Sequence, residues 1–375
     1  MSKVIIPGQT IGILGGGQLG RMMALSAREM GYKIAVMEPK KNSPTGQIAD
    51  VEIIASYDDQ SGAREMAEHC DVFTYEFENI EADTAGFLES HLYLPQGKDL
   101  LFITQHRIRE KKAIQEAGVE VAPYKEITSL EDLEASIQEL GLPAVLKTCR
   151  GGYDGKGQVV IQQAEEAEKA YSSLKESGEL VLEAWIPFKK EISVIVTRST
   201  NGETATFPLG ENIHVHNILH QTIVPARVEA QVKDKAETIA LQLAEHIKLV
   251  GTLAVEMFLT EEDTIYVNEL APRPHNSGHY TINACETSQF AQHIRAICGL
   301  PLGKTDLLKP VVMTNILGED LPKVLDHVQD IRDVHLHLYG KEEARPQRKM
   351  GHITVMGESV EEALGRTSNL GLWNK

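Results

Sequence analysis

The chain has 375 residues, of which 42% are hydrophobic and 24% are charged, a composition typical of globular proteins. Its 54 acidic and 37 basic residues give a formal net charge of -17, which argues against a nucleic-acid or anionic-membrane binder because both need a basic surface. No apolar run approaches the roughly 20 residues of a membrane-spanning helix, and the N-terminal segment does not have the architecture of a signal peptide.

The first hundred residues alternate between short apolar strands and helices. Gly31 is well placed to end the first of these helices. The rhythm predicts an open parallel sheet that is covered by helices. The predicted elements, in chain order, are 10–14, 19–30, 33–38, 53–54, 63–70 and 71–75.

The rest of the chain has a mixed pattern. A charged helix is predicted over 107–117, ended by Gly118, and antiparallel strands are predicted within 180–206, where the hydrophobic period is near two. We therefore expect three lobes: a nucleotide-type α/β domain, a small lid and a mixed α+β body. The further predicted elements are a strand at 144–148, a polar helix at 165–177, an amphipathic helix at 231–249, a hairpin at 255–270, a helix at 289–298 and short strands in the last 65 residues.

A glycine loop follows the first predicted strand. Residues 15–20 read Gly-Gly-Gly-Gln-Leu-Gly, which satisfies G-x-G-x-x-G, and Glu38 ends the next strand about 20 residues later, as in the dinucleotide-binding fingerprint. The same backbone amides at a helix N-terminus suit any phosphate, and Arg21 adds a cation. The motif alone therefore leaves three interpretations open: a phosphate monoester, which we favour, a nicotinamide dinucleotide, or a tight structural turn.

A second glycine loop spans 150–157, Arg-Gly-Gly-Tyr-Asp-Gly-Lys-Gly, after the strand at 144–148. Four glycines in seven positions cost backbone entropy, which a purely structural loop rarely requires. The spacing is not that of a Walker motif, so we expect a flap that closes over a triphosphate, with Lys156 at the phosphates. Lys147 lies within the apolar strand and needs a partner, for which a nucleotide phosphate is one candidate.

The hairpin at 255–270 carries two glutamates. If its turn centres on Glu262 and Asp263, Glu256 lies opposite Glu269 on the same face. Like charges at that separation destabilise a sheet unless a divalent cation lies between them, and oxygen ligands beside phosphates suit Mg²⁺. A solvated strand face is the alternative.

The segment after the hairpin, Ala-Pro-Arg-Pro-His-Asn-Ser-Gly-His at 271–279, is dense in hydrogen-bond donors. Arg273 offers a guanidinium fork for a carboxylate or bicarbonate. His275 and His279 could alternatively be ordinary surface histidines, but this setting favours a functional role for at least one of them.

These motifs together resemble the ATP-grasp superfamily. The lysine strand, the GGYDGKG flap, Glu183-Ala184-Trp185-Ile186, Glu191 and the Glu256/Asn268-Glu269 set carry the resemblance. GGGQLGRM near the start, GGYDGKGQ and NELAPRPHNSGHYT are more specific and resemble the N5-carboxyaminoimidazole ribonucleotide synthases of purine biosynthesis. The resemblance runs from Gly12 to about Gly357.

The resemblance implies a domain organisation and a set of site residues. It implies a Rossmann-like pre-ATP-grasp domain at 1–104, an ATP-grasp region at 105–310 with a lid at about 121–183, and a small β-rich C-terminal domain at 311–375 that packs on the ATP-grasp body. The implied ATP-binding residues are Arg107, Lys147, Gly152, Tyr153, Asp154, Gly155, Lys156, Gly157, Gln158, Glu183, Ala184, Trp185, Ile186, Glu191, His214, Asn268 and Glu269. The implied metal ligands are Glu256 and Glu269, for Mg²⁺ or Mn²⁺ in its place. The implied substrate-binding residues are Gly17, Gln18, Leu19, Arg21, Glu76, Lys341 and Arg348, and the implied catalytic residues are Arg273, His275 and Tyr153.

The implied reaction joins bicarbonate to 5-aminoimidazole ribonucleotide at the expense of ATP, through carboxyphosphate, and releases ADP and phosphate. A related ligase acting on glycinamide ribonucleotide and, more remotely, a nicotinamide-dependent oxidoreductase are the alternatives. We expect small-molecule partners only and a homodimer. Four dispersed cysteines without a CxxC pair predict reduced thiols in a cytoplasmic protein; they are Cys70, Cys149, Cys285 and Cys298.

Overall fold

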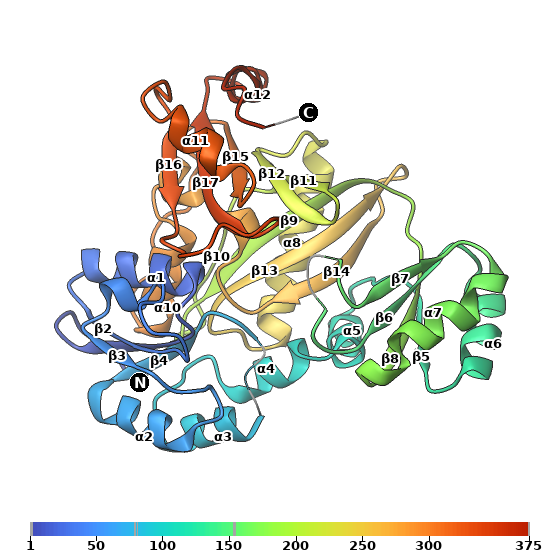
Figure 1. Cartoon of the computed structure of the whole chain (residues 1–375), viewed down its shortest axis with the longest axis horizontal. Helices are drawn as coiled ribbons and strands as arrows, with labels where there is room; N and C mark the ends of the chain where they lie inside the picture. The colour runs from blue at the N-terminus through green and yellow to red at the C-terminus, as the bar shows by residue number, and fades with distance from the viewer. Residues whose placement is uncertain (1–2, 79, 81, 153–154, 374–375) are drawn as a thin grey trace.

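The protein is built on three β-sheets, each with its own helices (Figure 1). The computed structural model describes residues 3–78, 80, 82–152 and 155–373. Among the helices in those residues, none combines the length and the apolar composition that crossing a membrane requires.

The N-terminal sheet has four parallel strands, as the sequence predicts, and their order is β3-β2-β1-β4. Helix α1 packs on it through Met22, Met23 and Ala27. Gly31 has a φ of +87°, a conformation that glycine adopts readily, at the expected end of this helix. The elements are β1 (Thr10–Leu14), α1 (Gln18–Glu29), β2 (Lys33–Met37), β3 (Val51–Ile53), α2 (Gln60–His69), β4 (Val72–Tyr75), α3 (Ala82–His91) and α4 (Lys98–Thr104).

A small antiparallel sheet forms the lobe that projects at the right of Figure 1. Its strand order is β5-β8-β6-β7, and two helices cover it with an apolar cluster that includes Leu133, Leu146 and Leu182. The predicted polar helix is shorter than expected, because single turns of 3₁₀ helix flank α7 on both sides. The elements are β5 (Tyr124–Ile127), α6 (Leu130–Leu140), β6 (Ala144–Thr148), β7 (Gln158–Ile161), α7 (Ala167–Leu174) and β8 (Leu180–Ala184).

The large sheet has nine strands in the order β14-β13-β9-β11-β12-β15-β17-β16, with β10 paired to β9. It gathers segments that are far apart in the sequence, since β12 pairs with β15 almost a hundred residues later. Its first six strands are β9 (Phe188–Arg198), β10 (Thr204–Thr206), β11 (Gly210–Val215), β12 (Ile218–Val224), β13 (Gly251–Thr260) and β14 (Ile265–Ala271).

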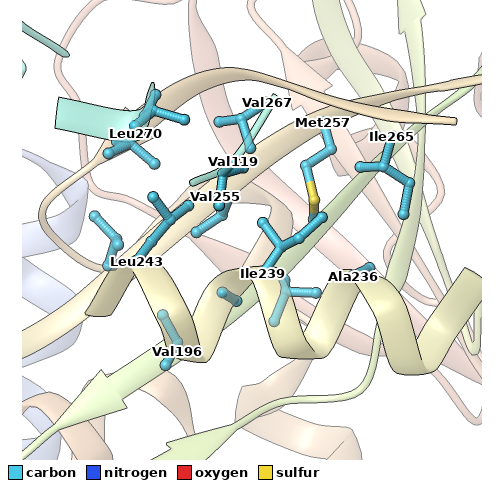
Figure 2. Close-up of a cluster of buried hydrophobic side chains, with 14 of the residues drawn as sticks. Val119, Val196, Ala236, Ile239, Leu243, Val255, Met257, Ile265, Val267 and Leu270 are labelled. Carbon is cyan, nitrogen blue, oxygen red and sulfur yellow. The ribbon is translucent and has the colours of Figure 1, made fainter. Parts of the chain in front are cut away.

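Helix α8 (Ala230–His246) covers one face of this sheet (Figure 2). Ala236, Ile239 and Leu243 recur at helical spacing, and they pack against buried side chains such as Val255 and Met257. Helix α5 (Arg107–Glu116) packs beside β14, and α10 (Gln289–Ile297), which follows the short α9 (Thr281–Ala284), contacts α1, β9 and β13. The core therefore holds the hairpin strands rigidly where they carry the glutamates.

The C-terminal segment extends the large sheet. Strands β15 (Val311–Leu317), β17 (Lys349–Met356) and β16 (His335–Leu338) join it beside β12. The expectation of only short strands here is wrong, because two helices are present, α11 (Leu321–Asp326) and α12 (Val360–Asn369). A capping signal for α12 was visible in the sequence: Ser359 accepts a hydrogen bond from the backbone N–H of Glu362.

Candidate active site

Two adjoining pockets contain most of the predicted site residues. The lid pocket lies where β6, β7 and β8 of the small sheet face β13 and β14. The loop pocket is lined by Gln18 and Leu19 of the first glycine loop and by residues that follow β4, β6 and β14. Six residues line both pockets: Arg107, Gly152, Glu269, His275, Asn276 and Lys349.

The lid pocket gathers nearly all of the residues predicted for ATP. Gly157 is not among its lining residues, and Tyr153 and Asp154 lie outside the described residues. Sequence reasoning missed the apolar lining, which includes Val145, Val160, Phe188, Leu219 and Phe258. The predicted ATP residues that line it are Arg107, Lys147, Gly152, Gly155, Lys156, Gln158, Glu183, Ala184, Trp185, Ile186, Glu191, His214, Asn268 and Glu269.

A buried ion cluster lies at the inner end of this pocket. The Nζ atoms of Lys147 and Lys111 lie 2.9 and 3.2 Å from Oε2 of Glu183. Burial raises the pKa of the Glu183 carboxyl, but Lys147, Lys111 and Arg107 outweigh it and hold that pKa at about 2. The partner that Lys147 needs is therefore a carboxylate of the neighbouring strand, and one lysine charge of the cluster remains uncompensated by Glu183.

The predicted pairing of Glu256 with Glu269 is confirmed, although the hairpin closes differently. The pairs from Ala254 to Glu256 have the expected register, but a bulge follows Glu256, so that Met257 pairs with Val267. Between the bulge and the turn, every pair is therefore offset by one residue from the assumed register, and Leu259 pairs with Ile265. Asn268 is the extra residue of the bulge, and without this bulge Glu256 would face Asn268 rather than Glu269.

This carboxylate pair carries electrostatic strain. Burial, the charge of Glu269 and that of Glu191 raise the pKa of Glu256 to about 8, although His214 lowers it. The Oδ1 atom of Asn268 is buried with no hydrogen-bond partner among the described residues. Two facing carboxylates and an unsatisfied amide oxygen form an all-oxygen donor set, so the residues present fit Mg²⁺.

The loop pocket takes in part of the predicted substrate set. Gln18, Leu19 and Glu76 of that set line it, together with Arg273 and His275, which were predicted as catalytic residues. The remaining four, Gly17, Arg21, Lys341 and Arg348, are not among its described lining residues. The Arg21 guanidinium instead donates to the carbonyl of Pro44 (2.7 Å), Lys341 Nζ to that of Lys349 (2.7 Å) and Arg348 to that of Glu343 (2.9 Å).

Two carboxylates already satisfy the amides of the first glycine loop. The N–H groups of Gly17 and Gly20 donate to the two carboxylate oxygens of Glu76 at 2.6 and 2.8 Å, and Gly16 N–H donates to Glu38 at 2.9 Å. A Cβ atom at Gly17 would lie 2.5 Å from Glu76 Oε1. The glycines thus allow a close approach of carboxylates, and Glu38 is committed to Gly16 and Tyr57 rather than exposed to a ribose.

Arg273 and His275 are held by neighbours. The Arg273 guanidinium is paired with Glu78, with Nε 2.8 Å from Oε2. Burial, together with the charges of Arg273, Lys349 and His214, holds the pKa of His275 well below its usual value. Because Ser277 N–H donates to His275 Nδ1, the neutral ring carries its proton on Nε2. In this state His275 is a hydrogen-bond donor rather than a base.

Three further residues of the loop pocket escaped the sequence analysis. Lys349 lines both pockets, one position after the predicted Arg348. Asn276 is buried, and neither atom of its amide has a partner among the described residues. Burial and the charge of Glu269 raise the pKa of Glu110 to about 8. The unsatisfied amide of Asn276 marks a position where a ligand can supply hydrogen bonds.

Comparison with known families covers most of the chain. A family model described as the ribonucleotide synthetase preATP-grasp domain matches residues 8–105, and one described as the ATP-grasp domain matches 112–290. A third, the phosphoribosylaminoimidazole carboxylase C-terminal domain, matches 311–366.

Full-length relatives share this organisation. The N5-carboxyaminoimidazole ribonucleotide synthase of Bacillus subtilis (strain 168) is 58% identical over 98% of this chain and 97% of its own length, and that of Staphylococcus aureus (strain COL) is 43% identical over 95% and 94%. A solved ADP complex of N5-carboxyaminoimidazole ribonucleotide synthetase superposes with a TM-score of 0.97 at 58% identity, covering 100% of this chain and 99% of the other. The Aspergillus clavatus enzyme in complex with ADP and 5-aminoimidazole ribonucleotide superposes with a TM-score of 0.91 at 31% identity, covering 96% and 97%.

Proposed function

The chain belongs to the family of N5-carboxyaminoimidazole ribonucleotide synthases, and from this premise we propose that it converts ATP, bicarbonate and 5-aminoimidazole ribonucleotide into ADP, phosphate and the N5-carbamate. It is then an ATP-dependent ligase of purine biosynthesis that forms a C–N bond. The proposal rests on a single observation: the two pockets adjoin, and Arg107, Glu269 and His275 line both of them.

The lid pocket suits ATP. Its apolar side chains, such as Phe258 and Val145, offer a slot for a flat base, while Lys147, Arg107 and Lys156 lie where phosphates need cations. The uncompensated charge of the cluster around Glu183 makes this end attractive to an anion. Glu191, 3.0 Å from His214, is available to ribose hydroxyl groups.

Glu256, Glu269 and the unsatisfied Oδ1 of Asn268 are the residues that would hold Mg²⁺, or Mn²⁺ in its place. When bound, such an ion supplies positive charge that offsets the charge developing on the transferred phosphoryl group. The guanidinium of Arg107, at the N-terminus of α5, lies 3.4 Å from the carboxylate of Glu269. One side chain can therefore hold a metal ligand in place and contact a phosphate.

Bicarbonate is a poor electrophile because its carbon is shielded by negative charge. Transfer of the γ-phosphoryl group to a bicarbonate oxygen gives carboxyphosphate, from which phosphate leaves when the exocyclic amine of the ribonucleotide attacks the carbon. His275, as an Nε2–H donor, and Asn276 lie where both pockets meet and can orient the bicarbonate. The flap at 150–157 keeps water from hydrolysing the intermediate.

The ribonucleotide then occupies the loop pocket. Lys349, Arg150 and Arg273 bring positive charge to its walls, and Gln18 and Leu19 lie at the start of α1. Because its guanidinium is paired with Glu78, Arg273 acts chiefly through its contribution to the electrostatic potential of this pocket.

The test is the rate of ADP release with each candidate ribonucleotide. ADP release should be slow with ATP alone and rise strongly when 5-aminoimidazole ribonucleotide and bicarbonate are both present, with labelled bicarbonate trapped in the product. Stimulation by glycinamide ribonucleotide instead would assign a different substrate to the same fold. No stimulation by either compound at any bicarbonate concentration would refute the carboxylase.

A homodimer in the cytoplasm completes the proposal. The four cysteines are free and three of them are buried, as suits a reducing compartment. Leu25 on α1 is exposed at the rim of a separate pocket, where an apolar contact with a second copy would cover it. Light scattering coupled to gel filtration measures the mass in solution, and a monomer at working concentration would contradict the dimer.

A further inference from the structure

Three side chains of different chemistry meet at the base of the flap. His106 immediately precedes α5, Cys149 follows β6, and Glu179 precedes β8. One potential ligand atom from each lies within 4.8 Å of the other two. We propose that His106, Cys149 and Glu179 form a binding site for a thiophilic divalent cation of the zinc class, and that its occupancy restrains the flap.

The backbone holds these three positions together in advance. Arg107 N–H donates to the carbonyl of Cys149 at 3.0 Å, and Cys149 N–H donates to the carbonyl of Glu179 at 2.8 Å. The ligand positions are therefore tied to each other by hydrogen bonds from residues at or next to them, so the cluster does not depend on an accidental approach of mobile side chains.

Two of the three side chains are buried and one is exposed. His106 and Cys149 are 4% and 1% exposed, whereas the side chain of Glu179 is 67% exposed. Nε2 of the His106 ring forms a hydrogen bond with the Glu179 carboxylate, whereas Nδ1 is buried without a hydrogen-bond partner among the described residues. Nε2 is therefore the nitrogen that a cation shared with Glu179 would coordinate, and the ring proton would then lie on Nδ1.

The donor set selects the metal. Imidazole nitrogen, thiolate sulfur and one carboxylate oxygen suit Zn²⁺ or Co²⁺, whereas Mg²⁺ prefers oxygen alone. Bond lengths of about 2.0–2.3 Å place tetrahedral ligand atoms roughly 3.3–3.8 Å apart. The most distant atoms of the cluster must therefore approach by up to about 1.5 Å, whereas Nε2 of His106 and Oε2 of Glu179, which are in hydrogen-bond contact, must move apart. The exposed Glu179 side chain is free to make that movement. Water would fill the fourth position.

Charge and proton balance are consistent with a divalent cation. Binding replaces the hydrogen bond between His106 and Glu179, and the Cys149 thiol releases its proton to solvent, so that one thiolate and one carboxylate neutralise the ion. Arg109 and Arg150 lie close enough to Glu179 to act on its charge and oppose the cation, while Glu126 adds negative charge near Cys149. Affinity should therefore rise with pH.

The site is adjacent to both parts of the phosphate machinery. Arg107, which lines both pockets, directly follows His106, and Arg150, the first flap residue, directly follows Cys149. Thr148 N–H donates to the carbonyl of Gly157 at 2.9 Å, which joins the two ends of the flap one residue from the site. A cation that crosslinks these residues fixes the hinge from which the flap moves, and turnover should slow.

The direct test uses Co²⁺ as a coloured probe on the metal-free full chain. We expect a saturable thiolate-to-cobalt charge-transfer band in the near ultraviolet, which Zn²⁺ abolishes by competition. Cys149→Ser should remove the band, whereas Cys70→Ser, which alters a thiol elsewhere in the chain, should retain it. Glu179→Gln, at an exposed position that folding tolerates, should keep the band at saturation and weaken the Kd for Co²⁺ by at least about tenfold.

Absence of the band in the wild type, or its survival in Cys149→Ser, would overturn the site. The spectrum does not depend on which reaction the enzyme performs, so a failure here is distinguishable from a failure of the proposed function. The effect on the flap is measured as Zn²⁺ inhibition of ADP release at saturating Mg²⁺, relative to the zinc-free rate of each variant. The half-inhibitory Zn²⁺ concentration should rise at least about tenfold in Glu179→Gln, and equal inhibition of both proteins would overturn the coupling.

Discussion

At the scale of single residues, charge pairing explains most of the lid pocket. The sequence showed that Lys147 needs a partner inside an apolar strand, but Glu183 became that partner only through the pairing of β6 with β8. Lys349 was missed for a related reason: its place in the pockets depends on where β17 pairs with β15, which no local pattern of the chain reports. Residues tied to a motif were predictable, whereas residues brought in by long-range pairing were not.

Glu269→Gln should lower the rate of ADP release by at least about 100-fold while leaving the fold intact, because it removes one carboxylate from the oxygen set that offsets phosphoryl charge. The same change relieves the repulsion that raises the pKa of Glu256, so the unfolding temperature should not fall. Glu262→Gln, in the exposed turn of the same hairpin, is the matched control. Turnover near that of the wild type at limiting Mg²⁺ would refute the metal assignment.

At the scale of elements, the hairpin and the first glycine loop show how a correct residue can follow from an incomplete geometry. The Glu256/Glu269 pair was predicted from an assumed turn, and the bulge at Asn268 restores it although the pairs next to the turn are offset by one residue. The glycine loop was interpreted as a phosphate site, but its amides bind Glu76 and Glu38. The motif indicates that an anion approaches the backbone closely enough to require glycine, but it does not indicate whether that anion is a phosphate or a carboxylate.

Gly17→Ala should raise the KM for the ribonucleotide far more than the KM for ATP. The new methyl group would meet Glu76 at 2.5 Å and force its carboxylate to move in the loop pocket, whereas the lid pocket is lined by other elements. Steady-state kinetics with each substrate varied in turn measure the two constants, and a roughly tenfold or larger ratio is expected from the loss of one charge-assisted hydrogen bond.

The control for this variant is Gly365→Ala in α12, where a methyl group meets nothing within 4 Å. It should leave both constants unchanged. A change confined to ATP in Gly17→Ala, or tight binding of NADH to the wild type, would show that the loop serves a different ligand.

At the scale of the whole molecule, three histidines connect the lobes. The rings of His279 and His352 are tilted at a centroid distance of 4.9 Å, those of His352 and His337 are stacked at 4.6 Å, and the three residues come from the segment before α9 and from β17 and β16. The ring of Tyr339 lies beside this stack and packs into the cluster under α1. The fold class and the parallel N-terminal sheet could be predicted from periodicity, but this junction could not, because histidine gives no hydrophobic period.

Stability should fall as the pH drops from 7 to 5. Burial, with smaller effects of neighbouring charges, lowers the pKa of six histidines below the unfolded value of 6.5, so below that pH the unfolded chain binds protons that the native chain does not. Glu110 and Glu256, with pKa values raised to about 8, oppose the trend because the native state binds their protons over the same range. The six histidines are His220, His275, His279, His293, His337 and His352.

Since the histidines outnumber the two glutamates, the free energy of unfolding should decrease by at least about 1.4 kcal/mol per pH unit below 6.5. Urea denaturation at pH 5, 6, 7 and 8 measures this slope. His337→Gln, at a partly buried position, should make it shallower, and His69→Gln, on the surface of α2, should not. A free energy of unfolding that is constant from pH 7 to 5 would contradict the assignment of neutral buried rings.

The pairing of β12 with β15 has a consequence for the chain during synthesis. Until residues 311–317 emerge and pair, the strand Ile218–Val224 offers a row of free amide and carbonyl groups along an apolar edge, and such an edge templates pairing with other chains. The last sixty-five residues therefore cover this strand edge and so prevent self-association, in addition to contributing Lys349 to the site. Any condition that delays their arrival, such as slow translation or premature termination, favours aggregates over an inactive soluble enzyme.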